Sequence, residues 1–306
     1  MNGGGQRAAA CPAGWSLVWS DEFDGPGLDA SKWDAEIGNG FRDASTGHWV
    51  EGWGNEELQY YTRDPANLCV DDGCLVIRAL EQSRDGCRYT SARIKTRGRD
   101  GRALFAKRYG RFEFRARVPY GKGLWPAIWL LPQDDRYGPW AASGEIDVME
   151  IVGEKPQEYL GSLHFGCVAP KRALVTHVHR FPAGTVADFH VYAIEWEPGV
   201  IRWIADGETW AEENFWWSCS ERQDGAGVEP NGPQQLNPWP APFDQPFYIV
   251  MNVAVGGNFP GAPDANTVFP AELCVDYVRV YDRTDGYGTL PARGSGRLPF
   301  ETPTTP

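Results

Sequence analysis

The chain alternates apolar and polar residues over short segments that Gly and Pro separate. In residues 109–118, Phe112, Phe114, Ala116 and Val118 alternate with charged side chains. A period of two residues is typical of a β-strand with one face in the core and the other in water. Few segments keep the 3.6-residue period of an amphipathic helix. The pattern therefore predicts an all-β protein.

The other predicted strands have the same short, apolar character. They are expected at residues 16–23, 74–80, 90–96, 188–197, 199–205, 245–255 and 273–281. Pro198 and Gly199 are typical of a hairpin turn. Residues 214–243 are irregular and rich in Pro and Gly, and loops of this length are usually functional or disordered.

A single domain over residues 11–284 accounts for this pattern, because all-β sandwiches of this size commonly form one domain. Residues 1–10 lack the apolar segment of a signal peptide and are expected to be an N-terminal leader or added residues. The apolar periodicity is lost from about Asp285. Residues 285–306 are therefore expected to be a tail or a linker that leads to a further module.

Three carboxylates, Glu145, Asp147 and Glu150, lie in an otherwise apolar run of residues 143–153. Burying an unpaired carboxylate is costly, so three in one run indicate a functional site. One interpretation is an amphipathic helix, in which Glu145 and Met149 would share a face. Glycines at both ends, the shortness of the run and its β-branched residues favour a strand instead.

In a regular strand Glu145 and Asp147 share one face, whereas Glu150 points to the other. A β-bulge at Val148–Met149 would return Glu150 to the first face. We therefore expect the bulge, because it would place all three carboxylates in one cleft.

Composition narrows the class of ligand. The formal net charge of −12 argues against nucleic acid or an anionic membrane as a partner, since both reward basic surfaces. The 14 Trp and 12 Tyr residues exceed ordinary core needs, and flat rings suit the apolar faces of sugars. Trp125, Ala127 and Trp129 would share one face of a strand, as a stacking platform or as core. A neutral ligand fits these features best.

The seven Cys residues show no paired Cys-x-x-Cys pattern of a zinc site, so disulfides and secretion are expected. Residues 68–75 are typical of two strands joined by a turn, which would place Cys69 opposite Cys74. No apolar stretch reaches the roughly 18 residues of a membrane span. The sequence therefore predicts a secreted protein.

The histidines give a weaker signal than the carboxylates. His177 and His179 alternate in a strand-like run without a third ligand nearby, and they are expected to be surface residues rather than a metal site. His164 is interpreted either as a hydrogen-bond donor in a cleft or as a core histidine.

Together these motifs resemble glycoside hydrolase family 16, in its laminarinase-like branch, over most of residues 15–282. Residues 144–150 match the family signature E-I-D-x-x-E in its bulged form. The departures are Phe259, where relatives often have Trp, and the insertion that contains Cys219. Both put the shape of the groove in question. Further matches are Trp53-Gly54-Asn55, Glu57-Leu58-Gln59, the WPAIWLLP segment at 125–132, Leu163-His164 and residues 252–258.

The resemblance implies a β-jelly-roll sandwich of two curved antiparallel sheets with a sugar-binding cleft on the concave side. It implies that Glu145 is the nucleophile, Glu150 the acid/base and Asp147 the residue that orients Glu145. An ionised neighbour raises the pKa of a carboxyl group, so Glu150 is expected to stay protonated while Glu145 stays charged. The sugar contacts that it implies are Asn55, Trp125, Trp129 and His164.

The resemblance also implies a structural calcium ion on the convex face, distant from catalysis. The matching positions are Glu22, the carbonyl of Gly73 and Asp276, an all-oxygen set of the kind that calcium prefers. The alternative interpretation is that Glu22 and Asp276 are ordinary surface acids.

The predicted function is a secreted, monomeric, retaining endo-1,3-β-glucanase that hydrolyses laminarin-like polysaccharide by double displacement. One alternative is another β-glycan substrate, such as mixed-linkage glucan or an algal galactan, or transglycosylation. A second is a non-catalytic β-glucan-recognition protein on the same scaffold. Binders of that kind usually lack catalytic carboxylates, and Glu145, Asp147 and Glu150 are all present.

Overall fold

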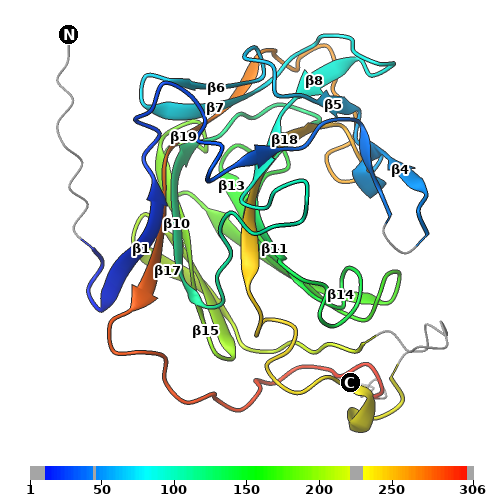
Figure 1. Cartoon of the computed structure of the whole chain (residues 1–306), viewed down its shortest axis with the longest axis vertical. Coiled ribbons are helices and arrows are strands. Elements are labelled where there is room, and N and C mark those ends of the chain that lie inside the picture. The colour runs from blue at the N-terminus through cyan, green and yellow to red at the C-terminus, as the bar shows by residue number, and fades with distance from the viewer. Residues whose placement is uncertain (1–10, 44–45, 221–229, 302–306) are drawn as a thin grey trace.

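The computed structural model describes residues 11–43, 46–220 and 230–301 (Figure 1). Two large antiparallel sheets form the body, so the predicted all-β sandwich is confirmed. The predicted leader at residues 1–10 and the last residues of the predicted tail, 302–306, lie outside the described part. Among the described residues, no helix is long and apolar enough to cross a membrane.

The first sheet has eight strands in the order β17-β16-β15-β10-β19-β7-β6, with β1 also paired to β19. We call it the outer sheet. Its strands are β1 (Trp15–Asp21), β6 (Leu68–Asp71), β7 (Cys74–Ala79), β10 (Gly110–Arg117), β15 (His190–Glu197), β16 (Val200–Ala205), β17 (Glu208–Glu213) and β19 (Ala271–Arg283).

The second sheet has seven strands in the order β14-β13-β12-β11-β18-β9-β2, and it carries the carboxylates. We call it the cleft sheet. Its strands are β2 (Asp34–Ala35), β9 (Arg93–Lys95), β11 (Leu124–Pro132), β12 (Glu145–Glu150), β13 (Glu158–Gly166), β14 (Arg172–Arg180) and β18 (Phe247–Val255).

Small elements connect the two sheets. The strand pairs are β3 (Gly40–Arg42) with β4 (Trp49–Glu51) and β5 (Gln59–Tyr61) with β8 (Tyr89–Ser91), and the 3₁₀ turns are η1 (Gly52–Gly54) and η2 (Pro233–Gln235).

The core lies between the two sheets and is built from alternate residues of each strand. Phe112 and Phe114 of β10 are fully buried, as the alternating pattern predicts. The other face of β10 was expected to lie in water, and this was wrong for Arg111 and Glu113, which are only 8% and 7% exposed. They are buried as an ion pair, with Arg111 Nη2 2.7 Å from Glu113 Oε2.

His177 and His179 lie on the face of β14 that is turned toward the outer sheet. The ring centroid of His177 is 5.5 Å from that of Trp203, and His179 is 5.3 Å from Trp210. Both histidines are part-buried, so their predicted place on the surface was wrong. The strand pattern did not reveal this, because both faces of β14 carry apolar and polar residues.

The hairpin predicted at residues 68–75 is present as β6 and β7. Its turn is Asp72-Gly73, with φ angles of 47° and 70°, which suits a two-residue turn of type I′. This turn makes Asp71 the partner of Cys74, so Cys69 is not opposite Cys74. The described disulfide is a different one, between Cys167 and Cys219.

The chain continues beyond β19 along the surface toward the loop of residues 214–243 (Figure 1). Trp239 Nε1 donates to the carbonyl oxygen of Pro291 at 2.8 Å, and Gly294 N donates to the carbonyl oxygen of Asn214 at 2.8 Å. The domain boundary expected at residue 284 stays a prediction, but residues 285–301 contact the body of the sandwich.

Candidate active site

β12 carries the three carboxylates and contains one extra residue. On its β11 side, Ile128 and Trp129 lie opposite Met149 and Asp147, so Val148 is extra. On its β13 side, the register shifts over the same stretch of β12. The bulge predicted at Val148–Met149 is therefore confirmed.

The bulge brings Glu150 to the face of Glu145 and Asp147. Val148 and Met149 are 1% and 0% exposed and both belong to the core, so two successive residues point inward. Glu145 and Glu150 stay partly exposed at the two ends of β12. The alternation of the strand thus restarts after the bulge, and the three carboxylates face the cleft.

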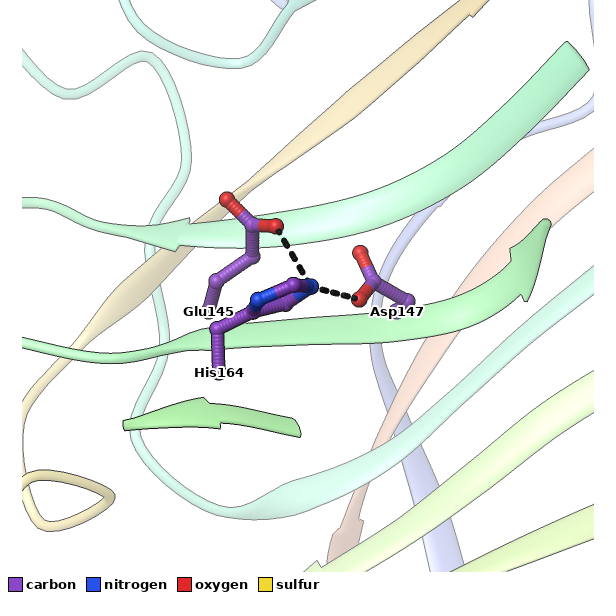
Figure 2. Close-up of side chains that lie close together, drawn as sticks. All are labelled: Glu145, Asp147 and His164. Carbon is purple, nitrogen blue, oxygen red and sulfur yellow. Dashed lines mark ion pairs between the residues drawn. The ribbon is translucent and has the colours of Figure 1, made fainter. Parts of the chain in front are cut away.

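His164 and Trp140 surround Glu145. His164 of β13 lies directly opposite Glu145, and its Nε2 is 3.5 Å from Glu145 Oε1 and 3.4 Å from Asp147 Oδ2 (Figure 2). Trp140 Nε1 donates a hydrogen bond to Glu145 Oε2 at 3.0 Å. The cleft position expected for His164 is therefore observed, and Trp140 is a contact that the sequence motifs did not reveal.

Trp125 contacts Glu150 as Trp140 contacts Glu145: its Nε1 donates a hydrogen bond to Glu150 Oε1 at 3.0 Å. Phe259 packs against Trp125 with ring centroids 5.3 Å apart. Asn55 lies at the same end, because a Cβ on Gly257 would come within 2.9 Å of its carbonyl oxygen and 3.4 Å of the Trp125 ring. The backbone of Asn55 thus lies beside Trp125, and its predicted sugar contact stays a prediction.

Trp129 of β11 lies opposite Asp147 of β12. Its Nε1 donates to Asn252 Oδ1 at 2.8 Å. The guanidinium of Arg93 stands 4.7 Å from the Trp129 ring and 4.8 Å from the Trp53 ring, between the two. One face of Trp129 is therefore covered by Arg93. Neither Arg93 nor the orientation of Asn252 was indicated by residue spacing.

Burial is the first cause that raises the pKa of each carboxyl group in the site, to about 8 for Glu145, Asp147 and Glu150. The charge of Asp147 raises the pKa of both glutamates further, while His164 lowers it in both. The expected contrast between a charged Glu145 and a protonated Glu150 is not found, because burial acts on both alike. The cluster as a whole retains protons at neutral pH.

Glu145, Asp147 and His164 also have the geometry of a possible metal site. Each offers one ligand atom, and these atoms lie within 4.8 Å of one another. Such a set could hold a cation, although the same atoms are the ones that the sequence assigns to catalysis.

The calcium ligands expected at Glu22, Gly73 and Asp276 fit the ion only in part. Pairing of β1 and β7 with β19 brings the three positions to one region of the outer sheet. However, both oxygens of Glu22 accept hydrogen bonds from Arg279, at 2.9 and 2.7 Å. Arg115 donates to Asp276 Oδ2 at 2.7 Å. A calcium ion would therefore compete with two guanidinium groups.

Comparison with known proteins places this geometry in a family. The profile of Glycosyl hydrolases family 16 matches residues 53–215, which include the bulged strand. A Beta-glucanase of Rhodothermus marinus is 44% identical over 286 residues, which cover 91% of this chain and 88% of the relative. Glucan endo-1,3-beta-glucosidase A1 of Niallia circulans is 43% identical over 280 residues. That match covers 88% of this chain but only 38% of the longer relative.

Solved structures agree with the sequence matches. The laminarinase catalytic domain from Thermotoga petrophila RKU-1 superposes with a TM-score of 0.71 at 36% identity, over 88% of this chain and 98% of that one. The jelly-roll architecture is thereby shown. The chain belongs to glycosyl hydrolase family 16.

Proposed function

We propose that this protein is a retaining endo-1,3-β-glucanase that cleaves internal β-1,3-glucosidic bonds of laminarin-like polysaccharide. The relatives named above are glucanases and laminarinases, which supports this substrate class. The single observation that carries the proposal is the bulge in β12, because it gathers Glu145, Asp147 and Glu150 on one face.

In the first step, Glu150 donates its proton to the glycosidic oxygen while Glu145 Oε attacks the anomeric carbon. The bond to the leaving sugar breaks, and an ester forms between Glu145 and the retained sugar. The raised pKa of Glu150 suits this role, since an acid must hold its proton until the bond breaks. Trp140 and His164 contact Glu145 and favour its charged form, which is the form that attacks.

In the second step, Glu150 takes a proton from water, and the water oxygen attacks the anomeric carbon on the side opposite to Glu145. The ester breaks, Glu145 regains its charge and Glu150 its proton. Two inversions give net retention. Asp147 lies between the glutamates, and its charge raises the pKa of Glu150. When Glu145 is esterified its charge disappears, which lowers the pKa of Glu150, so Glu150 stays deprotonated and can accept a proton from water.

The experiment is to incubate the protein with laminarin, lichenan and agarose and to identify the sugars released. We expect a series of oligosaccharides from laminarin, which would indicate endo action, with the β-anomer formed first in an NMR time course. A lack of products from laminarin would refute the substrate class. Products from lichenan or agarose alone would favour a mixed-linkage glucanase or a galactanase.

Secretion and a structural calcium ion at Glu22, Gly73 and Asp276 belong to the same proposal. Because Arg279 and Arg115 already supply positive charge there, we expect EDTA to lower the Tm by only about 1 to 3 °C. Calcium, but not magnesium, should restore it. A Tm that EDTA leaves unchanged would argue against the calcium site.

A further inference from the structure

The face of the cleft sheet that carries the carboxylates continues beyond β13 onto β14, the edge strand. Residues directly opposite each other in antiparallel strands share a face. The register places Leu174 opposite His164 and Thr176 opposite Ser162, and His164 is itself opposite Glu145. Leu174 and Thr176 therefore lie on the catalytic side of β14.

Side-chain contacts agree with this assignment. The hydroxyl oxygens of Ser162 and Thr176 are 3.1 Å apart, so these two side chains point to the same side. Val178 lies opposite Leu160, which in turn lies opposite Glu150. The intervening residues of β14 point the other way, toward the outer sheet, as the histidines do.

Two large aliphatic side chains on this face are exposed. Leu174 is 47% exposed and Val178 is 49% exposed, with Thr176 between them. Single exposed apolar residues are common, but these two share one strand face beside a polar cleft. We call Leu174, Thr176 and Val178 the β14 strip.

Trp140 and Arg172 border the strip at its Glu145 end. The Trp140 side chain is 37% exposed and its ring centroid is 5.5 Å from that of His164. The Arg172 guanidinium stands 5.4 Å from the same indole. Trp140, which donates a hydrogen bond to Glu145, therefore lies between Glu145 and the start of the β14 strip.

We propose that the β14 strip binds the apolar ring face of a further sugar unit of the same β-glucan chain that is cleaved at Glu145 and Glu150. This inference rests on the proposed function. The aliphatic side chains meet the C–H groups of the ring, and Thr176 and Arg172 offer hydrogen bonds to its hydroxyl groups. β14 is two strand spacings, about 10 Å, from β12, so the sugar is about two units from the cleaved bond.

The test uses the full chain with Leu174→Ser and Val178→Ser together, in the inactive Glu145→Ser background. Binding of β-1,3-linked disaccharide, tetrasaccharide and hexasaccharide is measured by calorimetry. We expect a loss of affinity that grows with chain length, to about three- to tenfold for the hexasaccharide. In the active enzyme, the same double variant should raise KM for laminarin and leave kcat unchanged.

Leu17→Ser with Val18→Ser is the matched control, because these residues are 46% and 49% exposed on β1 of the outer sheet. The control should bind every oligosaccharide as the parent does. Unchanged affinity of the strip variant at all lengths would overturn the proposal. So would an equal loss at all lengths, which would indicate a general structural effect.

A second copy of the chain is the other possible occupant of an exposed edge strand. If the strip variant converts a dimer to a monomer in sedimentation while its oligosaccharide affinity is unchanged, the strip is a self-interface and the proposal fails. The two proposals fail separately. A wild-type protein that does not cleave laminarin refutes the function, whereas active wild type with a normally binding strip variant refutes only the strip.

Discussion

Glu113 in the outer sheet and Asp147 in the cleft sheet are both nearly buried, with 7% and 2% of their surface exposed. Their partners differ. Arg111 donates two hydrogen bonds to Glu113, at 3.0 and 2.7 Å, and Tyr277 adds a third at 3.0 Å. Asp147 Oδ2 accepts no hydrogen bond from the described residues, and His164 Nε2 lies 3.4 Å from it.

The same contrast extends to the neighbouring residues. In the outer sheet Glu195 also pairs with Arg111, at 3.0 Å. In the cleft, Glu145 and Glu150 each receive one indole N–H, from Trp140 and Trp125, in place of a guanidinium. An indole N–H orients a carboxylate without cancelling its charge. The two cleft glutamates therefore accept hydrogen bonds from neutral indoles, whereas Arg111 neutralises Glu113 and Glu195 in the outer sheet.

The largest expected effect follows from removing a cleft carboxylate. Glu145→Gln and Glu150→Gln should each lower kcat for laminarin by at least about a thousandfold, because each removes a group that reacts with the sugar. Oligosaccharide binding should remain measurable. Steady-state kinetics check this, and near-normal turnover in either variant would remove that residue from its role.

Removing the ion pair between Arg111 and Glu113 in the outer sheet should lower stability rather than activity. Arg111→Met leaves Glu113 and Glu195 without their guanidinium, and we expect the free energy of unfolding to fall by about 3 to 5 kcal/mol. Arg88→Met is the control, because its ion pair with Glu81 is exposed to solvent and its loss should leave the free energy of unfolding nearly unchanged. Urea unfolding measures both, and equal losses would contradict the comparison.

Removing the charge of Asp147 should stabilise the fold as pH rises. Its pKa is raised to about 8 in the folded protein, against roughly 3.9 unfolded, so the native state holds a proton that the unfolded state has lost. Stability linked to this proton is complete below the unfolded pKa and is lost as pH rises through the folded one.

Asp147→Asn should therefore leave the Tm unchanged near pH 3.5 and raise stability by at least about 1 kcal/mol near pH 8. Activity should fall in the same variant. Thermal unfolding from pH 3.5 to pH 9 gives the profile. A constant difference over this range, or a loss that grows with pH, would contradict the assigned charge environment.

The two indole donors should have smaller and distinct effects. Trp140→Phe removes a hydrogen bond that lowers the pKa of Glu145, and Trp125→Phe removes the equivalent bond at Glu150. Each change should reduce kcat/KM about tenfold, which is about 1.4 kcal/mol. In the pH–rate profile, Trp140→Phe should move the acidic limb to higher pH, and Trp125→Phe the basic limb. Identical shifts would show that the donors do not act on separate carboxylates.

Several features could be predicted because they depend on local order along the chain. Alternating residues in β10 indicated a strand, and the spacing of Glu145, Asp147 and Glu150 required a bulge. A strand has only two faces, so counting positions between carboxylates is enough to detect an extra residue. The hairpin of β6 and β7 could be predicted for the same reason, because its turn at Asp72-Gly73 joins neighbouring segments of the chain.

Other features depend on pairing between distant segments. Cys69 was expected opposite Cys74, but the turn geometry offsets them, and Cys167 instead meets Cys219 from 52 residues away. His177 and His179 were assigned to the surface, because nothing in β14 reveals which of its faces packs on Trp203. The burial of Arg111 is likewise decided by the strands beside it.

The sequence by itself determined that three carboxylates lie on one bulged strand, since alternation and the number of intervening residues are properties of the chain alone. Only the tertiary structure decided what stands around them. Trp140 and Trp125 reach Glu145 and Glu150 from a loop and from another strand. The order of the strands decides that an indole, and not an arginine, donates each of these two hydrogen bonds. A carboxylate's pKa depends on its burial and neighbours, and these form only when the sheets assemble.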